Sequence, residues 1–387
     1  MAIAIVGSGP AGFYMADAVS KSLPNVRVHL FERLSLPFGL VRYGVAPDHV
    51  GTKAVYRLFD RVMKRPNVSF FGNVEIGRDV SLGQLESTYK VVVIATGGTV
   101  GRLLQFVGTE SFYHISGLDF AGWFNGKPDA LVAPPPSKAR SVCILGNGNV
   151  GLDAARLLTK SSVQLQEAGV PEPVVHWRSV LGLEAIHIFG RRGAAQTKFG
   201  VSELEELGRS QSFRPVVCPQ EVLDGQGENI AALDVLRKFS QDVPDDRLPI
   251  TFHFDTEILG GGDGCLKTNS PHSGLQSHEA GMLIHAIGQR ASPLPGLPFD
   301  EGAGFIPNEN GLIQGKENVY AIGWAAKAGG GQIASNRTHA QAILPRLAAH
   351  LSGSSTPANG FVNTPPPWLP FTAVTWEQAC AMDPWRT

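Results

Sequence analysis

Two glycine-rich loops of the form Gly-x-Gly-x-x-Gly are the parts of this 387-residue sequence best suited to chemistry. The first loop runs from Gly7 to Gly12 (GSGPAG), and the second runs from Gly146 to Gly151 (GNGNVG). Glycines let a backbone approach a pyrophosphate closely, and a helix that begins at such a loop offers free N–H groups to negative charge. The motif alone is a weak signal, so the residues around each loop decide whether it binds a dinucleotide.

An acidic residue follows the first loop where dinucleotide-binding folds place one. Val26–Phe31 reads as a strand that ends at Glu32, about 20 residues after Gly12. A carboxylate there accepts hydrogen bonds from ribose hydroxyls and repels a 2′-phosphate. We therefore expect the first loop to bind FAD or NAD rather than NADP. The alternative is a glycine-rich turn in an ordinary sheet.

The second loop differs at the residue that selects the nucleotide. Its next strand, Ala185–Phe189, is followed by Gly190, Arg191 and Arg192, and no acidic residue ends that strand. Guanidinium groups bind a 2′-phosphate through bidentate, charge-assisted hydrogen bonds. The second loop is therefore typical of an NADP site, the alternative being a solvated basic pair at a strand end.

Short apolar strands and helix-like segments alternate along the chain, and they must position these loops. Strands are predicted at Ala2–Val6, Val26–Phe31, Val91–Ile94, Ser141–Leu145, Ala185–Phe189, Met282–Ile287 and Val319–Ile322. Strands that alternate with helices favour parallel, doubly wound sheets. The sequence thus predicts an α/β fold with two Rossmann-like dinucleotide-binding domains. The polar, glycine-rich stretch Leu259–Gln276 is expected to form a hairpin and loop.

The composition excludes several classes of protein. The formal net charge is −1, so no overall field attracts nucleic acid or an anionic membrane. No apolar run reaches the roughly 18 residues of a membrane helix, and the N-terminal residues do not read as a signal peptide. The four cysteines form no C-x-x-C pair, and the spacing of histidines and cysteines predicts no metal site. We expect a cytoplasmic protein that neither inserts into membranes nor binds nucleic acid.

Longer motifs than the two loops point to a family. They are GSGPAGFY at Gly7–Tyr14, PFGLVRYGVAPDH at Pro37–His49, GNVEIGRDV at Gly72–Val80, ATGG at Ala95–Gly98, GNGNVGLDAARLL at Gly146–Leu158, GRRGAAQTKF at Gly190–Phe199, and the Gly323-Trp324 pair. With these motifs the chain resembles the adrenodoxin reductase-type ferredoxin–NADP reductases, flavoproteins of the glutathione-reductase-like superfamily. The block Pro37–His49 is long and idiosyncratic, so it is the most specific of these matches.

The resemblance implies a domain plan and two sets of cofactor contacts. An FAD-binding domain formed by residues 1–105 and 322–387 would hold an inserted NADP-binding domain, residues 106–321. The implied FAD contacts are Gly7, Gly9, Ala11, Gly12, Glu32, Leu40, Ile76, Trp324, Gly331, Gln332 and Ile333. The implied NADPH contacts are Gly146, Asn147, Gly148, Asn149, Arg191, Arg192 and Glu203.

Two further residues match positions that the family keeps close to the flavin and nicotinamide. The resemblance implies that His49 and Asp153 act there as a proton or hydrogen-bond relay. Taken alone, His49 reads as a loop histidine with structural hydrogen bonds, and Asp153 as an acid that favours its helix dipole. Both interpretations stay open on the sequence.

The sequence also departs from the family pattern. The loop Ala326–Gly331 (AKAGGG) replaces the family's Lys-Arg-Gly-Pro-Thr-Gly, which predicts a more flexible loop over the flavin, and Ser292 stands where an arginine is expected. Arg237 and Lys238 lie near the family's basic docking patch, but three aspartates follow closely at 242, 245 and 246. The docking surface is therefore expected to be less basic than in the family.

The leading functional prediction is a flavoprotein oxidoreductase that passes electrons from NADPH through FAD to a one-electron carrier, a small iron–sulfur protein such as a ferredoxin. A flavin can link two-electron and one-electron transfers, and that chemistry belongs to the cofactor. The first alternative is an NADPH-dependent diaphorase or oxidase that acts on a small molecule. The second is a flavin-binding scaffold that has lost turnover.

Overall fold

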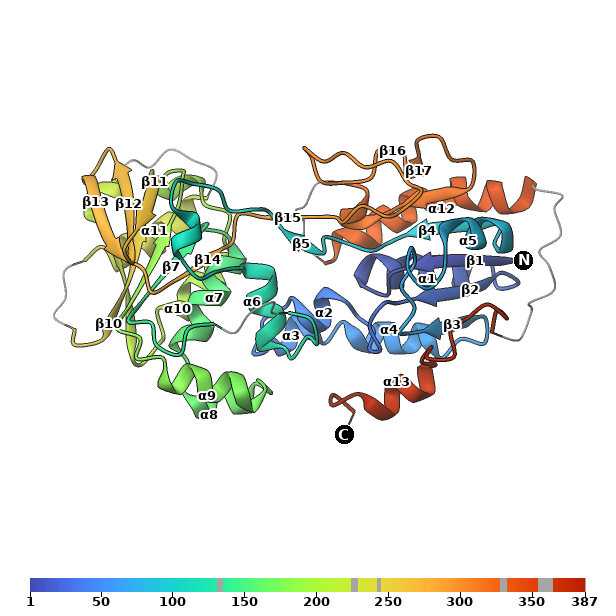
Figure 1. The fold of residues 1–387 in the computed structure, drawn as a ribbon, viewed down its shortest axis with the longest axis horizontal. Helices are drawn as coiled ribbons and strands as arrows, with labels where there is room; N and C mark the ends of the chain where they lie inside the picture. Colours follow the sequence, from blue (N-terminus) through green and yellow to red (C-terminus); the bar gives the residue numbers. More distant parts are fainter. Residues whose placement is uncertain (131–134, 224–228, 242–244, 328–332, 354–364, 387) are drawn as a thin grey trace. The chain divides into compact units, whose positions relative to one another are not determined.

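The computed structural model describes residues 1–130, 135–223, 229–241, 245–327, 333–353 and 365–386. The chain forms two compact units (Figure 1). Unit 1 contains Met1–Val45, Val50–Val100 and Gly288–Thr387, and unit 2 contains Ala46–His49 and Gly101–Ile287.

Unit 1 is built on a seven-stranded sheet in the order β16-β17-β18-β4-β1-β2-β3. The five strands from β18 to β3 are parallel, and β16 and β17 add an antiparallel edge. The strands of unit 1 are β1 (Ala2–Val6), β2 (Arg27–Phe31), β3 (Val68–Phe71), β4 (Val91–Ile94), β16 (Asn308–Glu309), β17 (Leu312–Ile313) and β18 (Val319–Ala321). Its helices are α1 (Pro10–Ser22), α2 (Leu40–Tyr43), α3 (Val50–Lys53), α4 (Tyr56–Met63), α5 (Leu82–Thr88), α12 (Ser335–Gly353) and α13 (Trp376–Met382), with a 3-10 turn η4 (Gly323–Ala325).

The central strand β1 explains why this sheet is covered on both faces. Successive side chains of a strand point to opposite faces, and all of β1 from Ile3 to Val6 is buried. Ile3 and Ile5 pack in one apolar cluster with side chains of α1, α4 and α12. Ala4 and Val6 pack in a second cluster with side chains of α5. The sheet is therefore doubly wound, as expected.

Unit 2 is built on a six-stranded parallel sheet in the order β6-β14-β7-β8-β10-β9. Its strands are β6 (His114–Ser116), β7 (Ser141–Leu145), β8 (Ala185–Phe189), β9 (Phe213–Val217), β10 (Leu248–His253) and β14 (Met282–His285). Its helices are α6 (Gly117–Phe124), α7 (Asn149–Thr159), α8 (Ser162–Glu167), α9 (Glu172–Val180), α10 (Val201–Leu207) and α11 (Ile230–Phe239), with 3-10 turns η1 (Thr109–Ser111), η2 (Ala194–Gln196) and η3 (Pro219–Val222).

The two faces of the unit 2 sheet have different coverings. Ile144 and Ile186 belong to the large apolar cluster formed with the helices. Cys143 and Phe189, on the alternate face, pack with Leu266 in a smaller cluster. Leu266 belongs to a separate antiparallel sheet of three strands, β11 (Glu257–Gly262), β12 (Cys265–Ser270) and β13 (Gly274–Glu279). The stretch expected to be a hairpin and loop is thus a complete three-stranded sheet.

The return of the chain from unit 2 to unit 1 after β14 lies earlier than the sequence suggested. The short strand β5 (Val100–Gly101) lies where the chain enters the long segment of unit 2, and β15 (Gln289–Arg290) lies just after it returns to unit 1. The expected boundary at residues 321 and 322 is therefore displaced to 287 and 288. The reason is that β18 pairs with β4, and the antiparallel edge before it belongs to the same sheet. The predicted strand Met282–Ile287 ends at His285.

No helix in the described part of the chain combines the length and apolar character needed to cross a membrane.

Candidate functional site

The first glycine loop is a tight turn between β1 and α1 in unit 1. Gly7 has a φ of 104°, and a Cβ at this residue would lie 2.5 Å from the carbonyl oxygen of Ala95. A Cβ at Gly12 would lie 2.0 Å from the carbonyl oxygen of Gly7. No side chain fits at either position, so the loop stays close to the ends of β1 and β4. The first turn of α1 has no intrahelical acceptors for its N–H groups, which leaves them for an anion.

Glu32 lies beside this loop, directly after β2. Its Oε2 accepts hydrogen bonds from the backbone N–H (3.0 Å) and the hydroxyl (2.8 Å) of Ser8. Its Oε1 accepts from the backbone N–H of Leu34 at 3.2 Å. The carboxylate is therefore held against the glycine loop, as the dinucleotide pattern requires. Ser8 was not singled out in the sequence, although its place between two glycines of the loop was a usable signal.

Other residues of the expected FAD set lie around the same loop. A Cβ at Gly39, the residue before Leu40, would lie 2.8 Å from the Cα of Gly9. A Cβ at Gly323, the residue before Trp324, would lie 2.7 Å from the Cβ of Ala11. Three segments far apart in the sequence therefore meet at the start of α1.

For two of the remaining residues expected to contact FAD, Ile76 and Ile333, the structure shows burial in an apolar cluster or packing against one. Ile76 is buried in the apolar cluster that also contains Val6 and Ala325. Ile333 is half-buried and packs against the apolar cluster on the other face of the sheet. Gly331 and Gln332 lie outside the described residues, as does most of the Ala326–Gly331 loop.

The second glycine loop repeats this geometry between β7 and α7 in unit 2. Gly146 has a φ of 120°, and a Cβ at Gly151 would lie 2.3 Å from the carbonyl oxygen of Gly146. A Cβ at Gly148 would meet nothing within 4 Å among the described residues, so its surroundings leave room for a ligand. Asn149 accepts a hydrogen bond from the backbone N–H of Gly200 at 2.8 Å.

The two arginines after β8 are exposed and available. Among the described residues, neither the guanidinium of Arg191 nor that of Arg192 has a hydrogen bond or ion pair. The amide nitrogen Nδ2 of Asn147 is buried without a partner in the described part of the chain, and a Cβ at Gly190 would lie 2.3 Å from it. The second loop and the arginine segment are therefore in contact, so one bound molecule can reach both.

Glu203 lies in the first turn of α10, where its Oε2 accepts from the hydroxyl of Ser202 at 2.8 Å. A Cβ at Gly200 would lie 2.1 Å from the same oxygen. The carboxylate therefore lies close to Gly200 at the start of α10, and the backbone N–H of Gly200 donates a hydrogen bond to Asn149.

His49 and Asp153 meet within unit 2. The Nε2 of His49 lies 3.7 Å from Oδ1 of Asp153 and 3.6 Å from Oε2 of Glu206. Asp153 Oδ1 also accepts a hydrogen bond of 2.6 Å from Nη2 of Arg156. His49 thus has two carboxylates in reach, and Arg156 forms an ion pair with each of them.

The sequence did not identify four charged residues around this pair as candidate site residues: Asp48, Arg156, Lys160 and Glu206. Arg156 forms an ion pair with Asp48 and lies 3.6 Å from Glu206, and Lys160 lies 3.0 Å from Asp48. Arg156 is three residues after Asp153 on α7, a spacing that puts both side chains on one helix face, and this was a usable signal. Glu206 on α10 is distant in sequence and gave none.

The electrostatics of the network favour a proton on Asp153. Burial raises the pKa of Asp153 to about 7, with Glu203 and Glu206 adding to the rise and His49 opposing it. Burial also lowers the pKa of Arg156 and that of Lys160. A carboxyl group with a pKa near neutrality can both hold and release a proton at the pH of a cell.

A family model matches the N-terminal part of this chain, and curated relatives match most of its length. Residues 1–176 match the model described as pyridine nucleotide-disulphide oxidoreductase. NADPH-ferredoxin reductase FprA of Mycobacterium leprae is 33% identical over 385 residues, which cover 91% of this chain and 84% of that relative. Mitochondrial NADPH:adrenodoxin oxidoreductase of Bos taurus is 29% identical over 402 residues, covering 93% of this chain and 82% of that relative.

Solved structures have the same fold. The structure of Mycobacterium tuberculosis FprA in complex with NADPH matches with a TM-score of 0.86 and 30% identity, covering 92% of this chain and 87% of that one. The thioredoxin reductase of T. acidophilum matches with a TM-score of 0.53 at 16% identity and covers 90% of this chain and 98% of that one, a likeness of fold alone.

Proposed function

The chain belongs to the adrenodoxin reductase-type ferredoxin–NADP reductases, and from this premise we propose how its residues serve the reaction. The protein is an FAD-dependent oxidoreductase that passes electrons from NADPH to a one-electron carrier such as a ferredoxin. Bound FAD supplies the exchange between two-electron and one-electron transfer. The observation that carries the proposal is the pair of loops: Glu32 lies beside the first loop, and Arg191 and Arg192 follow the strand next to the second.

Unit 1 would hold FAD. The pyrophosphate would bind at the first loop, where close-packed glycines and the start of α1 present N–H groups. Glu32 would accept hydrogen bonds from the adenosine ribose, because a carboxylate has about four lone-pair sites and Ser8 and Leu34 donate three hydrogen bonds to it. Leu40, Ile76, Trp324, Gly331, Gln332 and Ile333 would complete the FAD contacts.

Unit 2 would hold NADPH. The open space at Gly148 supports a pyrophosphate at the second loop. The exposed guanidinium groups of Arg191 and Arg192 would bind the 2′-phosphate, and Asn147, Asn149 and Glu203 would orient the rest of the nucleotide.

His49 and Asp153 would serve as a positioning pair that holds or moves a proton. The support is the reach of His49 Nε2 to two carboxylates and the raised pKa of Asp153. Arg156 would orient Asp153 through its 2.6 Å hydrogen bond.

The absorbance spectrum of the purified protein under argon tests this function. We expect a yellow protein whose flavin band bleaches with NADPH and much less with NADH. A ferredoxin added with cytochrome c should then raise the rate of cytochrome c reduction. A colourless protein that takes up no FAD on reconstitution would contradict the proposal.

A second candidate is an NADPH-dependent diaphorase or oxidase with a small-molecule acceptor. It is favoured by Arg237, whose guanidinium is already engaged with Asp234 at 3.0 Å and with the carbonyl of Val222 at 3.2 Å. The basic patch expected for an iron–sulfur partner is correspondingly weakened. If no ferredoxin in a panel raises cytochrome c reduction above that of the enzyme alone, the acceptor is of this second kind.

The iron–sulfur partner and a cytoplasmic location are parts of the same proposal. Both named groups of relatives act with ferredoxin or adrenodoxin by their names, and the bovine relative is mitochondrial. Cell fractionation with an antibody against the chain would test the location.

A further inference from the structure

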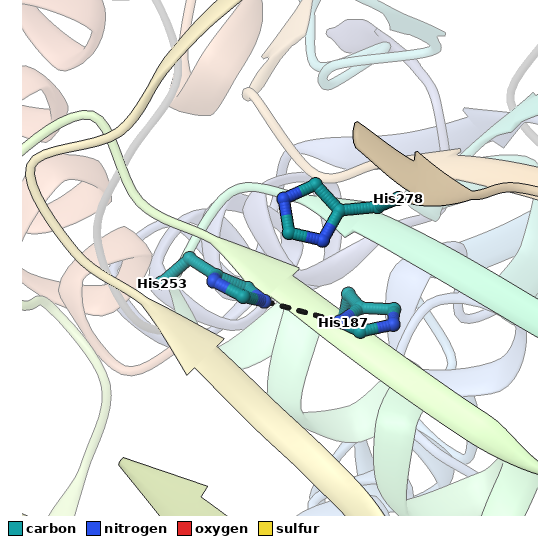
Figure 2. A group of neighbouring side chains, drawn as sticks. All are labelled: His187, His253 and His278. Atoms are coloured by element: carbon teal, nitrogen blue, oxygen red, sulfur yellow. Dashed lines mark hydrogen bonds between the residues drawn. The ribbon is translucent and has the colours of Figure 1, made fainter. Parts of the chain in front are cut away.

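Three histidine side chains from distant parts of the sequence meet in unit 2. His187 comes from β8, His253 from β10 and His278 from β13. One nitrogen of each ring lies within 4.8 Å of one nitrogen of each of the others. Figure 2 shows the three rings gathered around one point.

The strand pattern explains why they meet. On β10, Ile250 and Phe252 point into the helix-covered cluster, so His253 points to the opposite face. His187 points to that face too, because Phe189, two residues further along β8, packs in the smaller apolar cluster on that face. This is the face that β11–β13 covers, and His278 is the buried residue among exposed neighbours on β13.

The distances suit a metal ion. His187 Nδ1 and His253 Nε2 lie 3.0 Å apart. A tetrahedral Zn²⁺ with nitrogen ligands at about 2.0–2.1 Å sets those nitrogens about 3.3–3.4 Å from one another. Small side-chain movements would therefore separate these two nitrogens enough for both to bind one ion, and would bring a nitrogen of His278 to the same ion.

Thr268 orients the ring of His278. The hydroxyl of Thr268 is hydrogen-bonded to Nε2 of His278 at 3.0 Å. This bond leaves Nδ1 of His278 for the other two rings. Metal-binding histidines commonly use their second nitrogen in this way, because the bond fixes the tautomer and the orientation of the ring.

The surroundings keep the rings neutral. Burial lowers the pKa of His187 to about 4 and that of His253 to about 3, with His278 adding to both shifts. Burial also lowers the pKa of His278. Neutral imidazole is the form that binds a metal, so no proton has to be displaced near neutral pH.

We propose that His187, His253 and His278 bind one divalent transition-metal ion, for which Zn²⁺ is the best match. Three imidazoles suit Zn²⁺, and the fourth position of a tetrahedral site would take water. The ion would tie the three-stranded sheet β11–β13 to the six-stranded sheet through His278.

Metal analysis of the FAD-loaded protein tests the proposal. The protein is dialysed against a chelator, incubated with Zn²⁺ and freed of excess metal by gel filtration. We expect one Zn²⁺ per chain and a thermal unfolding temperature that rises with Zn²⁺. The variants His253→Ala and His278→Ala should retain no Zn²⁺ and show no rise.

His176→Ala is the matched control, because His176 is exposed on α9 and lies outside the cluster. It should bind Zn²⁺ as the unaltered protein does. Equal Zn²⁺ retention by His278→Ala and the unaltered protein would overturn the proposal, as would failure of the unaltered protein to retain any.

Two measurements keep the proposal testable if the histidine variants do not fold. Thr268→Val keeps all three ligands, and its Zn²⁺ affinity should fall about 10–100-fold, as for other outer-shell losses. Cu²⁺ bound to the unaltered protein should give an electron paramagnetic resonance spectrum with splitting from several nitrogens. Unchanged affinity in Thr268→Val, or a Cu²⁺ spectrum with oxygen ligands only, would count against the site.

Discussion

At the scale of single residues, the proposed choice of nucleotide depends on whether the charged side chain beside each loop is already engaged. Arg191 and Arg192 are exposed and unpaired among the described residues, whereas Glu32 is held by Ser8 and Leu34. A pair of unengaged guanidinium groups favours the binding of a doubly charged phosphate group through charge-assisted hydrogen bonds. The two loops therefore differ in chemistry although they share one backbone geometry.

The variant Arg191→Ala with Arg192→Ala should lose NADPH affinity and keep NADH affinity. Each lost charge-assisted hydrogen bond costs about 1.5–3 kcal/mol, so KM for NADPH should rise by one order of magnitude or more. Steady-state kinetics with both nucleotides measure the effect. Arg209→Ala, at an exposed arginine on another segment, is the control. Equal losses for both nucleotides would show that the pair does not contact the 2′-phosphate.

A second prediction concerns the proton on Asp153. Its carboxyl has a raised pKa of about 7, so it carries a proton below that pH and loses it above. If that proton is used, the rate of flavin reduction by NADPH falls as pH rises through about 7, and Asp153→Asn removes this step. Stopped-flow absorbance across the neutral range measures it. Glu205→Gln, at an exposed acid on α10, should keep the profile of the unaltered protein, and a step that persists in Asp153→Asn would assign it elsewhere.

At the scale of elements, each strand–loop–helix unit depends on glycines for two distinct reasons. Gly151 is required by the protein itself, since its Cβ would lie 2.3 Å from a backbone oxygen. Gly148 meets nothing within 4 Å in the described structure, and its φ is −102°, which any residue adopts. The requirement at Gly148 would come from the ligand.

Alanine variants should separate these two reasons. Gly151→Ala should destabilise unit 2 by about 1–3 kcal/mol, the usual cost of overpacking, or more because the clash is with backbone. Gly148→Ala should keep its stability and lose NADPH affinity, because the new methyl group stands where the pyrophosphate would approach. Denaturant unfolding and nucleotide titration measure the two effects. Loss of stability in Gly148→Ala with unchanged affinity would contradict this division.

At the scale of the whole molecule, contacts between distant parts of the chain close each unit. In unit 1, Arg42 of the Pro37–His49 block forms two hydrogen bonds, 2.8 and 2.7 Å, with Asp383 near the C-terminus. Both side chains are 3% exposed, and the guanidinium lies 4.2 Å from the ring centre of Trp385. Burial would raise the pKa of Asp383, but the bonds with Arg42 hold it below its ordinary value.

Removing one partner of this pair should destabilise unit 1. Asp383→Ala leaves the Arg42 guanidinium buried without its carboxylate, which costs about 3–5 kcal/mol. Thermal unfolding and the FAD content after purification measure the loss. Glu377→Ala, at an exposed residue on helix α13, which ends just before Asp383, should behave as the unaltered protein. Similar stability for the two variants would mean that the pair contributes little.

The sequence by itself determined the two strand–loop–helix units, the acid after the first and the arginines after the second. These features are local: a loop, its helix and the residue that ends the next strand are fixed by neighbours within a few tens of residues. The doubly wound fold followed from the same alternation of strands and helices.

Only the tertiary structure decided which distant side chains meet. The sequence did not show that Asp48 and Glu206 join His49 and Asp153, that the chain crosses back at residues 287 and 288, or that three scattered histidines share one face. Each of these depends on pairing between strands or packing between helices that are far apart along the chain. Periodicity reports which face of an element is buried, but it does not report what lies against that face.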